Sequence, residues 1–255
     1  IIMALCELHF SSAVLKRAQT CCVILPEPIE KRREYPVLYL LHGYSDDYSI
    51  WLRRTSLERY LSGAGLIVVM PDGGHEFYVD ADTGYNYETF IIEELFPIIE
   101  GYFPVSSSGE KRSIGGLSMG GYGAMRFGLK YPSHFASVHS HSGAFDIETR
   151  SHQTENTLEH LQRVFGETIE GTDRDLFTLV KEVDPKELPQ IKFDCGFDDH
   201  CLEDNRKLDK AFKEKGINAQ YDEYPGAHNW DFWDTHITDA LTFHRKVLNI
   251  DGDNN

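Results

Sequence analysis

The sequence predicts an α/β fold, in which helices cover both faces of a mostly parallel sheet. Short continuous apolar runs at residues 37–41 and 66–70 are typical of strands buried on both faces of such a sheet. Amphipathic stretches of helical length alternate with these runs. The chain has 255 residues, of which 41% are hydrophobic and 26% charged, and this suits one large globular domain.

The predicted elements alternate along most of the chain. A hairpin pairs residues 4–10 with residues 20–25, and six more strands follow at 37–41, 66–70, 113–115, 135–141, 191–196 and 218–224. Helices are predicted at 48–62, 88–103, 122–130, 154–164, 172–183, 202–215 and 231–248. Residues 146–190 interrupt the alternation, so we expect a small cap-like insertion there, within a single domain spanning 1–255.

The charge balance limits the classes of partner. The chain has 25 basic and 41 acidic residues, a net charge of −16, which disfavours binding to nucleic acid or to an anionic membrane. No apolar run approaches the roughly 20 residues that a membrane-spanning helix needs. We therefore expect no nucleic-acid partner and no membrane partner, and the sequence leaves a homo-oligomer open.

The cysteines and clustered histidines argue against a metal site. The five cysteines are odd in number, Cys21 and Cys22 are adjacent, and no C-x-x-C pair occurs. This pattern fits reduced, buried thiols better than disulfides or zinc ligands. His139 and His141 share one face of a predicted strand, where buried, hydrogen-bonded histidines are favoured over a metal pair.

The N-terminal residues lack the basic start of a signal peptide. Together with the reduced thiols, this leads us to expect a cytoplasmic protein.

A G-x-S-x-G motif at residues 116–120 provides a candidate nucleophile. This pattern predicts a sharp strand-to-helix turn with Ser118 at its apex, and Gly116 and Gly120 leave room for the two elements to pass. A serine needs a base to take its proton, so the motif predicts a histidine and a carboxylate further along the chain. A glycine-rich turn that contains a serine by chance is the alternative.

Two later loops supply the carboxylate and the base. Asp198 and Asp199 both follow a late strand; the G-x-x-D spacing favours Asp199, which leaves Asp198 to cap the turn. His228 is the histidine of the loop after the last strand, whereas His236 lies inside the following helix and is the weaker candidate. The order Ser118, Asp199, His228 is that of α/β-hydrolases, which extends the predicted fold class to an α/β-hydrolase fold with an eight-stranded sheet.

The apolar strand that ends at His42-Gly43-Tyr44 predicts half of an oxyanion hole. We expect the backbone N–H groups of Tyr44 and Met119 to be its donors. His42 precedes the nucleophile, so we expect it to hold the loop by hydrogen bonds rather than to act as the base. Aromatic residues near the predicted site either stack on a sugar or phenolic group or pack in the core and rim: Tyr44, Tyr78, Trp230 and Trp233.

These motifs together resemble the esterase D family of α/β-hydrolases. The resemblance runs from about residue 4 to about residue 247 and rests on Leu41-His42-Gly43 and on the segments 116–124, 195–199 and 226–230. Residues 86–95 and 228–233 resemble the bacterial tributyrin esterase branch, together with its feruloyl and acetylxylan esterases. The resemblance implies that Ser118, Asp199 and His228 form a triad and that no cofactor is needed.

The expected activity is that of a serine carboxylesterase. The resemblance implies short-chain acyl esters as substrates, either small molecules or acetylated or feruloylated carbohydrate. Thioester hydrolysis of S-formylglutathione is an alternative, which Tyr122 disfavours because those enzymes usually carry histidine at this place in the motif. Acyl transfer to a sugar is a further alternative, and an inactive hydrolase-fold binding protein is the non-enzymatic one.

Overall fold

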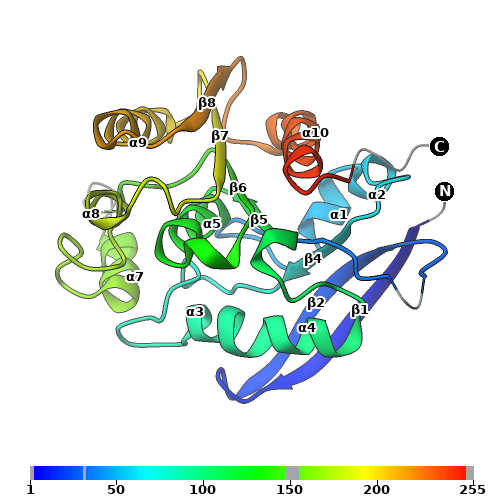
Figure 1. Ribbon diagram of the computed structural model, residues 1–255. Coiled ribbons are helices and arrows are strands. Elements are labelled where there is room, and N and C mark those ends of the chain that lie inside the picture. Colours follow the sequence, from blue (N-terminus) through cyan, green and yellow to red (C-terminus); the bar gives the residue numbers. More distant parts are fainter. Residues whose placement is uncertain (1–2, 31–32, 148–154, 251–255) are drawn as a thin grey trace.

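One eight-stranded sheet forms the centre of the computed structural model, which describes residues 3–30, 33–147 and 155–250 (Figure 1). The strand order is β1-β2-β4-β3-β5-β6-β7-β8. The strands are β1 (Met3–Ser12), β2 (Arg17–Pro26), β3 (Val37–Leu41), β4 (Ile67–Pro71), β5 (Arg112–Leu117), β6 (Ser137–His141), β7 (Gln190–Gly196) and β8 (Ala219–Tyr224). β2 runs antiparallel to β1 and β4, and the other neighbours are parallel. The predicted fold class is therefore confirmed.

Helices pack on both faces of this sheet, and alternate residues of β3 point into two separate cores. Leu38 and Leu40 pack toward α1 (Ile50–Arg54), α2 (Leu57–Tyr60) and α10 (Trp230–Val247). Tyr39 and Leu41 pack on the opposite face. That face is covered by α5 (Met119–Lys130), α9 (Leu202–Lys215) and the stretch α3 (Tyr87–Thr89), η1 (Phe90–Leu95) and α4 (Phe96–Tyr102) (Figure 1). Short turns at η2 (Gly109–Lys111) and η3 (Pro132–His134) flank β5 and α5.

Two of the predicted long helices are not continuous α-helices in the structure. The helix predicted at 48–62 is interrupted between α1 and α2, because the Thr55 hydroxyl donates to the Trp51 carbonyl at 2.6 Å and accepts from the Leu57 N–H at 3.1 Å. These side-chain bonds replace helical ones. The helix predicted at 88–103 contains the π-helical turns of η1 just before Pro97. Wider turns accommodate proline, which lacks an N–H and crowds the preceding turn.

The segment between β6 and β7 contains α7 (Glu155–Phe165) and α8 (Leu176–Glu182). The helix predicted at 172–183 is shorter in the structure, because the Asp175 carboxylate accepts from the N–H groups of Phe177 and Thr178 at 3.0 and 3.1 Å and so starts the helix at Leu176. Residue 154, the predicted start of the preceding helix, lies outside the described residues. None of the described helices is long and apolar enough to cross a membrane.

A cluster of charges around the buried Arg126 fastens this segment to α5. Arg126 is almost completely buried and pairs with Glu88 at 2.7 Å and with Asp173 at 3.1 Å. Its Nε also donates to the Asp173 carbonyl at 2.8 Å. Lys130, one turn further along α5, pairs with the same two carboxylates. The chain just before α8 is therefore held against the helix that begins at residue 119.

The turn between β5 and α5 has the shape that its glycines predict. Ser118 has φ +53° and ψ −114°, a conformation that non-glycine residues rarely adopt. A Cβ atom at Gly116 would lie 2.6 Å from the Gly120 carbonyl carbon, and one at Gly120 would lie 2.6 Å from the His42 carbonyl oxygen. Only glycine fits at these two positions, so β3, β5 and α5 approach closely around the serine.

Histidines form a buried hydrogen-bonded cluster between the sheet and α10. His244 contacts the Ser137 hydroxyl through Nδ1 and His139 Nδ1 through Nε2, each at 2.7 Å, and His141 Nδ1 lies 2.8 Å from Asp194. The favoured interpretation of His139 and His141 as buried, hydrogen-bonded residues is confirmed. Burial lowers the pKa of His139 well below its usual value and lowers that of His244 to about 3.

This cluster predicts that the protein loses stability in mild acid. An unfolded histidine has a pKa of about 6.5, so below that pH the unfolded chain binds more protons than the folded one. We expect His139 and His244 each to lower the free energy of unfolding by up to about 1.4 kcal/mol per pH unit below about pH 6.5. Urea unfolding of wild type and His244→Gln across this range measures the effect. The variant should show the shallower dependence, the exposed His9→Gln control should match wild type, and equal slopes for all three would contradict the prediction.

The turn at Ser118 predicts a second effect, on folding. Gly120→Ala places a methyl group against the backbone of β3, and we expect it to destabilise the fold by about 1–3 kcal/mol or more. The control is Gly101→Ala in α4, where nothing lies within 4 Å of the added atom. That change is expected to be neutral or to stabilise by up to about 1 kcal/mol. Similar unfolding midpoints for the two variants would show that the close approach at Gly120 does not matter.

Candidate active site

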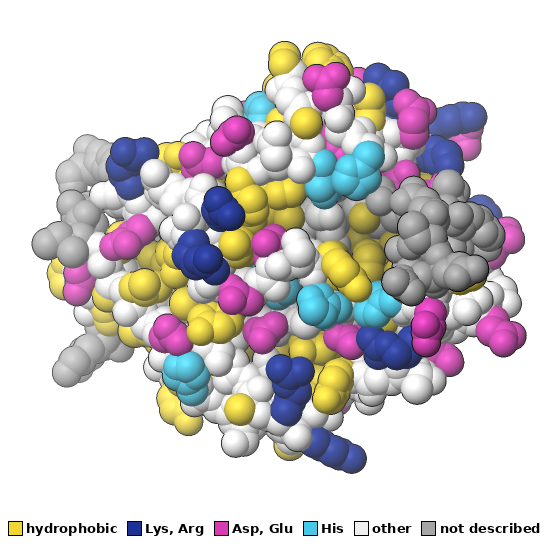
Figure 2. Space-filling view, turned by 180° about the vertical axis from the view of Figure 1, so that it is seen from behind, with side chains coloured by type: hydrophobic (Ala, Val, Ile, Leu, Met, Phe, Trp, Pro, Cys, Tyr) yellow, Lys and Arg dark blue, Asp and Glu magenta, His cyan; other side chains and the backbone are white. Residues whose placement is uncertain are grey.

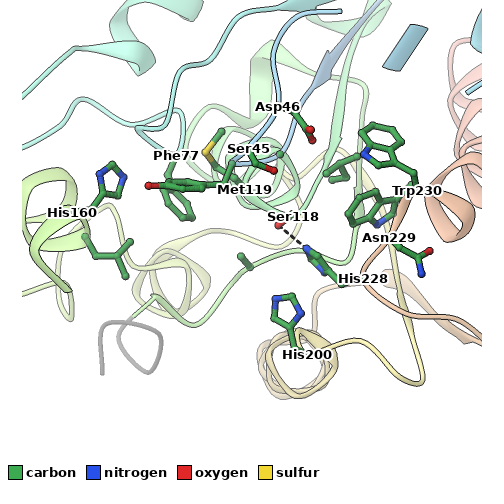
Figure 3. A pocket seen from close by; sticks show the side chains of 16 residues that line it. Ser45, Asp46, Phe77, Ser118, Met119, His160, His200, His228, Asn229 and Trp230 are labelled. Atoms are coloured by element: carbon green, nitrogen blue, oxygen red, sulfur yellow. Dashed lines mark hydrogen bonds between the residues drawn. The ribbon is translucent and has the colours of Figure 1, made fainter. Parts of the chain in front are cut away.

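Ser118, His228 and Asp199 form a chain of hydrogen bonds at the carboxyl ends of the parallel strands. His228 Nε2 lies 3.0 Å from Ser118 Oγ (Figure 3). His228 Nδ1 lies 2.9 and 3.0 Å from the two oxygens of Asp199. The serine comes from the turn after β5, the aspartate from the turn after β7 and the histidine from the loop after β8. The topology therefore brings together the three residues that the motifs selected.

Asp199, rather than Asp198, occupies the position of the acid. The Asp199 side chain is fully buried and also accepts a 2.7 Å hydrogen bond from the Cys201 N–H. Burial by itself would raise its pKa, but hydrogen bonding and charge attraction from His228 outweigh burial and hold the pKa below its usual value. Asp198 is exposed, and its N–H donates to the Gly226 carbonyl. The alternative base His236 stacks instead on Tyr224, with ring centroids 4.2 Å apart.

Neighbouring residues fix the orientation of the His228 ring. Trp233 meets it edge-on with ring centroids 4.9 Å apart, and the Trp233 indole N–H donates to Ser142 Oγ at 3.1 Å. Asn229 begins α10 by accepting the Phe232 N–H at 3.1 Å through its side chain. His228 is thus held by Asp199 at Nδ1 and by Trp233 of α10 against its ring.

The hydrogen-bonded chain opens into a cavity of about 700 Å³. Ser118 lies between two ends of this cavity, with His160 and Phe77 toward one end and Trp230 toward the other (Figure 3). The remaining lining residues are Gly43, Tyr44, Ser45, Asp46, Leu117, Met119, Ala144, Leu161, His200, His228, Asn229 and Trp233. In Figure 2, histidine side chains gather beside apolar ones near the middle of one face of the molecule.

Three of the four aromatic residues singled out in the sequence line this cavity: Tyr44, Trp230 and Trp233. The prediction that Tyr78 lines the pocket is wrong, because that side chain is completely buried. Its hydroxyl accepts from the His42 N–H at 3.0 Å and donates to the His42 carbonyl at 3.1 Å. Its ring fills the space that Gly73 and Gly123 leave free. Tyr78 therefore supports the loop at residues 42–44 from beneath.

His42 holds its loop, as expected. Its Nδ1 lies 2.7 Å from the Gly43 carbonyl, and its Nε2 accepts the Gly73 N–H at 2.8 Å. With Nε2 occupied as an acceptor, the proton is on Nδ1, which donates to Gly43. Both nitrogens serve the loops after β3 and β4, so His42 takes no part in the chain that ends at Ser118.

Several lining residues were missed by the sequence analysis. His160 and Leu161 belong to α7, and only the expectation of an insertion over the site pointed to that segment. His160 meets the Tyr44 ring edge-on with ring centroids 5.3 Å apart, and both residues line the cavity. His200 packs on His228 with ring centroids 4.2 Å apart, and its place next to Asp199 in the chain was the available indication.

This geometry provides a serine hydroxyl beside a histidine lone pair, with an ionised carboxylate behind the histidine. Such an arrangement can activate the hydroxyl for attack on an acyl carbon. The cavity supplies room for an acyl group and a leaving group around the same atom. This set of donors and acceptors can perform that attack without a metal or a cofactor.

Comparisons with known proteins agree with the geometry. The Esterase family model matches residues 12–244. An acetyl esterase of Caldicellulosiruptor saccharolyticus is 33% identical over 96% of this chain and 99% of its own. The structure of an S-formylglutathione hydrolase from Staphylococcus aureus is 28% identical, with a TM-score of 0.86 over 95% of this chain and 98% of its own. A ferulic acid esterase is 27% identical, with a TM-score of 0.84 over 97% and 100% of the two chains. The chain therefore belongs to the esterase family and is a carboxylic ester hydrolase of the α/β-hydrolase fold.

Proposed function

We propose that this esterase hydrolyses short-chain acyl esters through Ser118, with His228 as the general base and Asp199 as the acid that orients it. The observation that carries the proposal is the unbroken chain Ser118 Oγ–His228 Nε2 and His228 Nδ1–Asp199, at 3.0 and 2.9 Å. The chain lies on the wall of a cavity of about 700 Å³. A buried, ionised Asp199 keeps the His228 proton on Nδ1, so Nε2 presents a lone pair to the serine.

The reaction proceeds in two halves. Ser118 Oγ attacks the ester carbonyl while His228 Nε2 takes its proton, and Asp199 stabilises the resulting imidazolium. The imidazolium then gives that proton to the leaving alcohol, so that an acyl-enzyme remains on Ser118. Water attacks this ester in the second half with His228 again as base, releasing the carboxylic acid and restoring the serine.

We assign the stabilisation of the oxyanion to two backbone N–H groups, those of Met119 and Tyr44. Met119 is the first residue of α5, and the first N–H groups of a helix have no acceptor within it. Tyr44 follows Gly43, where a Cβ atom would lie only 3.8 Å from Ser118 Cβ. Each donor is expected to contribute about 3–4 kcal/mol to stabilising the transition state.

The lining of the cavity favours a substrate with a short acyl group and an alcohol that can be a carbohydrate. Apolar side chains from Phe77, Leu161 and Trp233 line it, and the exposed Tyr44 ring offers a surface on which a sugar can stack. We propose that residues 146–190 are a cap-like insertion in one domain, since α7 contributes lining residues. The 33% identical relative is an acetyl esterase, which supports acetyl esters first.

Thioester hydrolysis of S-formylglutathione is the second candidate. The 28% identical structure of such an enzyme favours it, and the same three residues would perform the chemistry. Tyr122, the residue that departs from the usual histidine of that group, is completely buried and its hydroxyl donates to the Arg174 carbonyl. It therefore does not line the cavity, so this departure leaves the thioester candidate open.

We propose a cytoplasmic location because of the state of the cysteine thiols. None of the five cysteines, all of which lie in the described part of the chain, forms a disulfide, and four of them are buried. Burial raises the pKa of Cys21 to about 12 and that of Cys22 to about 11, which leaves little reactive thiolate. Reduced cysteines of this kind are typical of proteins in a reducing compartment.

The first test compares wild type with Ser118→Ala on p-nitrophenyl acetate, butyrate and octanoate, a feruloyl ester and S-formylglutathione. We expect the highest kcat/KM on acetate among the chain lengths and a loss of at least ~10³-fold in the variant. A higher kcat/KM on S-formylglutathione would instead favour the thioester function. A folded wild type without activity on any substrate would contradict the proposal, and a fluorophosphonate probe that fails to label Ser118 would identify a binding protein.

The second test separates the two neighbouring aspartates. Asp199→Asn removes the charge that holds the His228 tautomer, and we expect kcat to fall by about 10⁴-fold. Asp198→Asn is the matched control, because the exposed Asp198 contributes only its backbone N–H to the loop, and its rate should stay near that of wild type. Equal losses in the two variants would refute the assignment.

A further inference from the structure

Four potential metal ligands converge behind Ser118, and three of them are consecutive in the chain. Asp199, His200, Cys201 and His228 each offer one ligand atom, and these four atoms all lie within 4.8 Å of one another. The sequence gives no spacing typical of a metal site, because the fourth member comes from a separate loop. The cluster exists only because β7 and β8 are neighbours in the sheet.

The donor set and its spacing fit zinc. Imidazole nitrogen, carboxylate oxygen and thiolate sulfur are the usual zinc ligands, at about 2.0–2.3 Å from the metal. Two ligands of one tetrahedral ion are therefore roughly 3.3 Å apart. Asp199 Oδ1 lies 2.9 Å from His228 Nδ1 and 3.9 Å from His200 Nδ1, on either side of that value. Small side-chain movements bring all three into coordination.

An ion can reach this place from the cavity. His200 lines the cavity and its side chain is 60% exposed, whereas that of Asp199 is fully buried and that of His228 is 19% exposed. Figure 3 shows the His200 ring next to the His228 ring. His200 is therefore the outermost ligand, and Cys201 is buried behind it.

We propose that a zinc ion binds across Asp199, His200 and His228, with Cys201 as the fourth ligand, and that this ion reversibly inhibits the enzyme. The ion takes the lone pair of His228 Nδ1, so the imidazole proton moves to Nε2. Cys201 releases its thiol proton to solvent as it binds. Ser118 then faces an N–H instead of a lone pair, and no group remains to take its proton. Inhibition rests on the proposed role of His228, whereas metal binding does not.

Binding and inhibition are therefore measured separately, on protein without a histidine tag. Calorimetric titration with Zn²⁺ gives the affinity, and the visible and near-ultraviolet spectrum with Co²⁺ reports tetrahedral coordination and a thiolate ligand. The inhibitory Zn²⁺ concentration is determined relative to the metal-free rate of each variant, and EDTA should restore that rate. We expect His200→Ala to weaken binding and to raise the inhibitory concentration by at least ~10-fold. Cys201→Ser should remove the thiolate band.

The matched control is His9→Gln. His9 also lies beside a carboxylate, at 2.9 Å from Glu7, but on the exposed hairpin, and its variant should bind zinc and be inhibited like wild type. Wild type that binds no zinc, or His200→Ala that binds it as tightly as wild type, would overturn the proposed site. Zinc that binds through His200 without slowing hydrolysis would overturn the inhibition. Loss of activity in Ser118→Ala is independent of all these outcomes.

Discussion

The backbone conformation of Ser118 is the constraint on which the arrangement depends. A positive φ at this residue turns the chain from β5 directly into α5, and it leaves the side chain at the apex of the turn. The turn is possible only because Gly116 and Gly120 carry no side chain where β3 and α5 approach. The Ser118 N–H donates to the His141 carbonyl, so β6 also holds the serine. The strain at the serine is thus maintained by two neighbouring strands and a helix.

The parallel sheet explains why residues far apart in sequence meet at this serine. β5, β6, β7 and β8 are successive neighbours and run in one direction, so the loops after them lie at the same edge. Asp199 and His228 follow β7 and β8 and reach back toward Ser118. The close contact of Gly196 with the Gly226 carbonyl brings these two loops together. A carboxylate that is buried but ionised then completes the chain, because its charge is matched by hydrogen bonds rather than by water.

Much of this was predictable because it depends on local chemistry. Apolar runs located the strands, and motif spacing located Ser118, Asp199 and His228. What the sequence could not provide depends on contacts between distant segments. Tyr78 looks like a pocket residue in an aromatic loop, but Gly73 and Gly123 leave the space into which it is buried. Asp234 of α10 reinforces the break at Thr55, because its carboxylate accepts a hydrogen bond from the Ser56 N–H. His160 reaches the cavity from α7, and the apolar pattern of that helix marks its buried side without showing which residues reach the cavity.

The charges that fasten residue 173 to α5 have a consequence for how substrate preference can change during evolution. The segment between β6 and β7 supplies one wall of the cavity through α7, yet its anchor lies outside it, at Arg126, Lys130 and Glu88. A transplanted segment that lacked a carboxylate at this place would leave a buried guanidinium with one partner fewer. Recombination between relatives would therefore succeed most often when the segment and its three anchoring residues travel together. The cavity wall that α7 supplies would then be inherited together with its anchor, rather than one lining residue at a time.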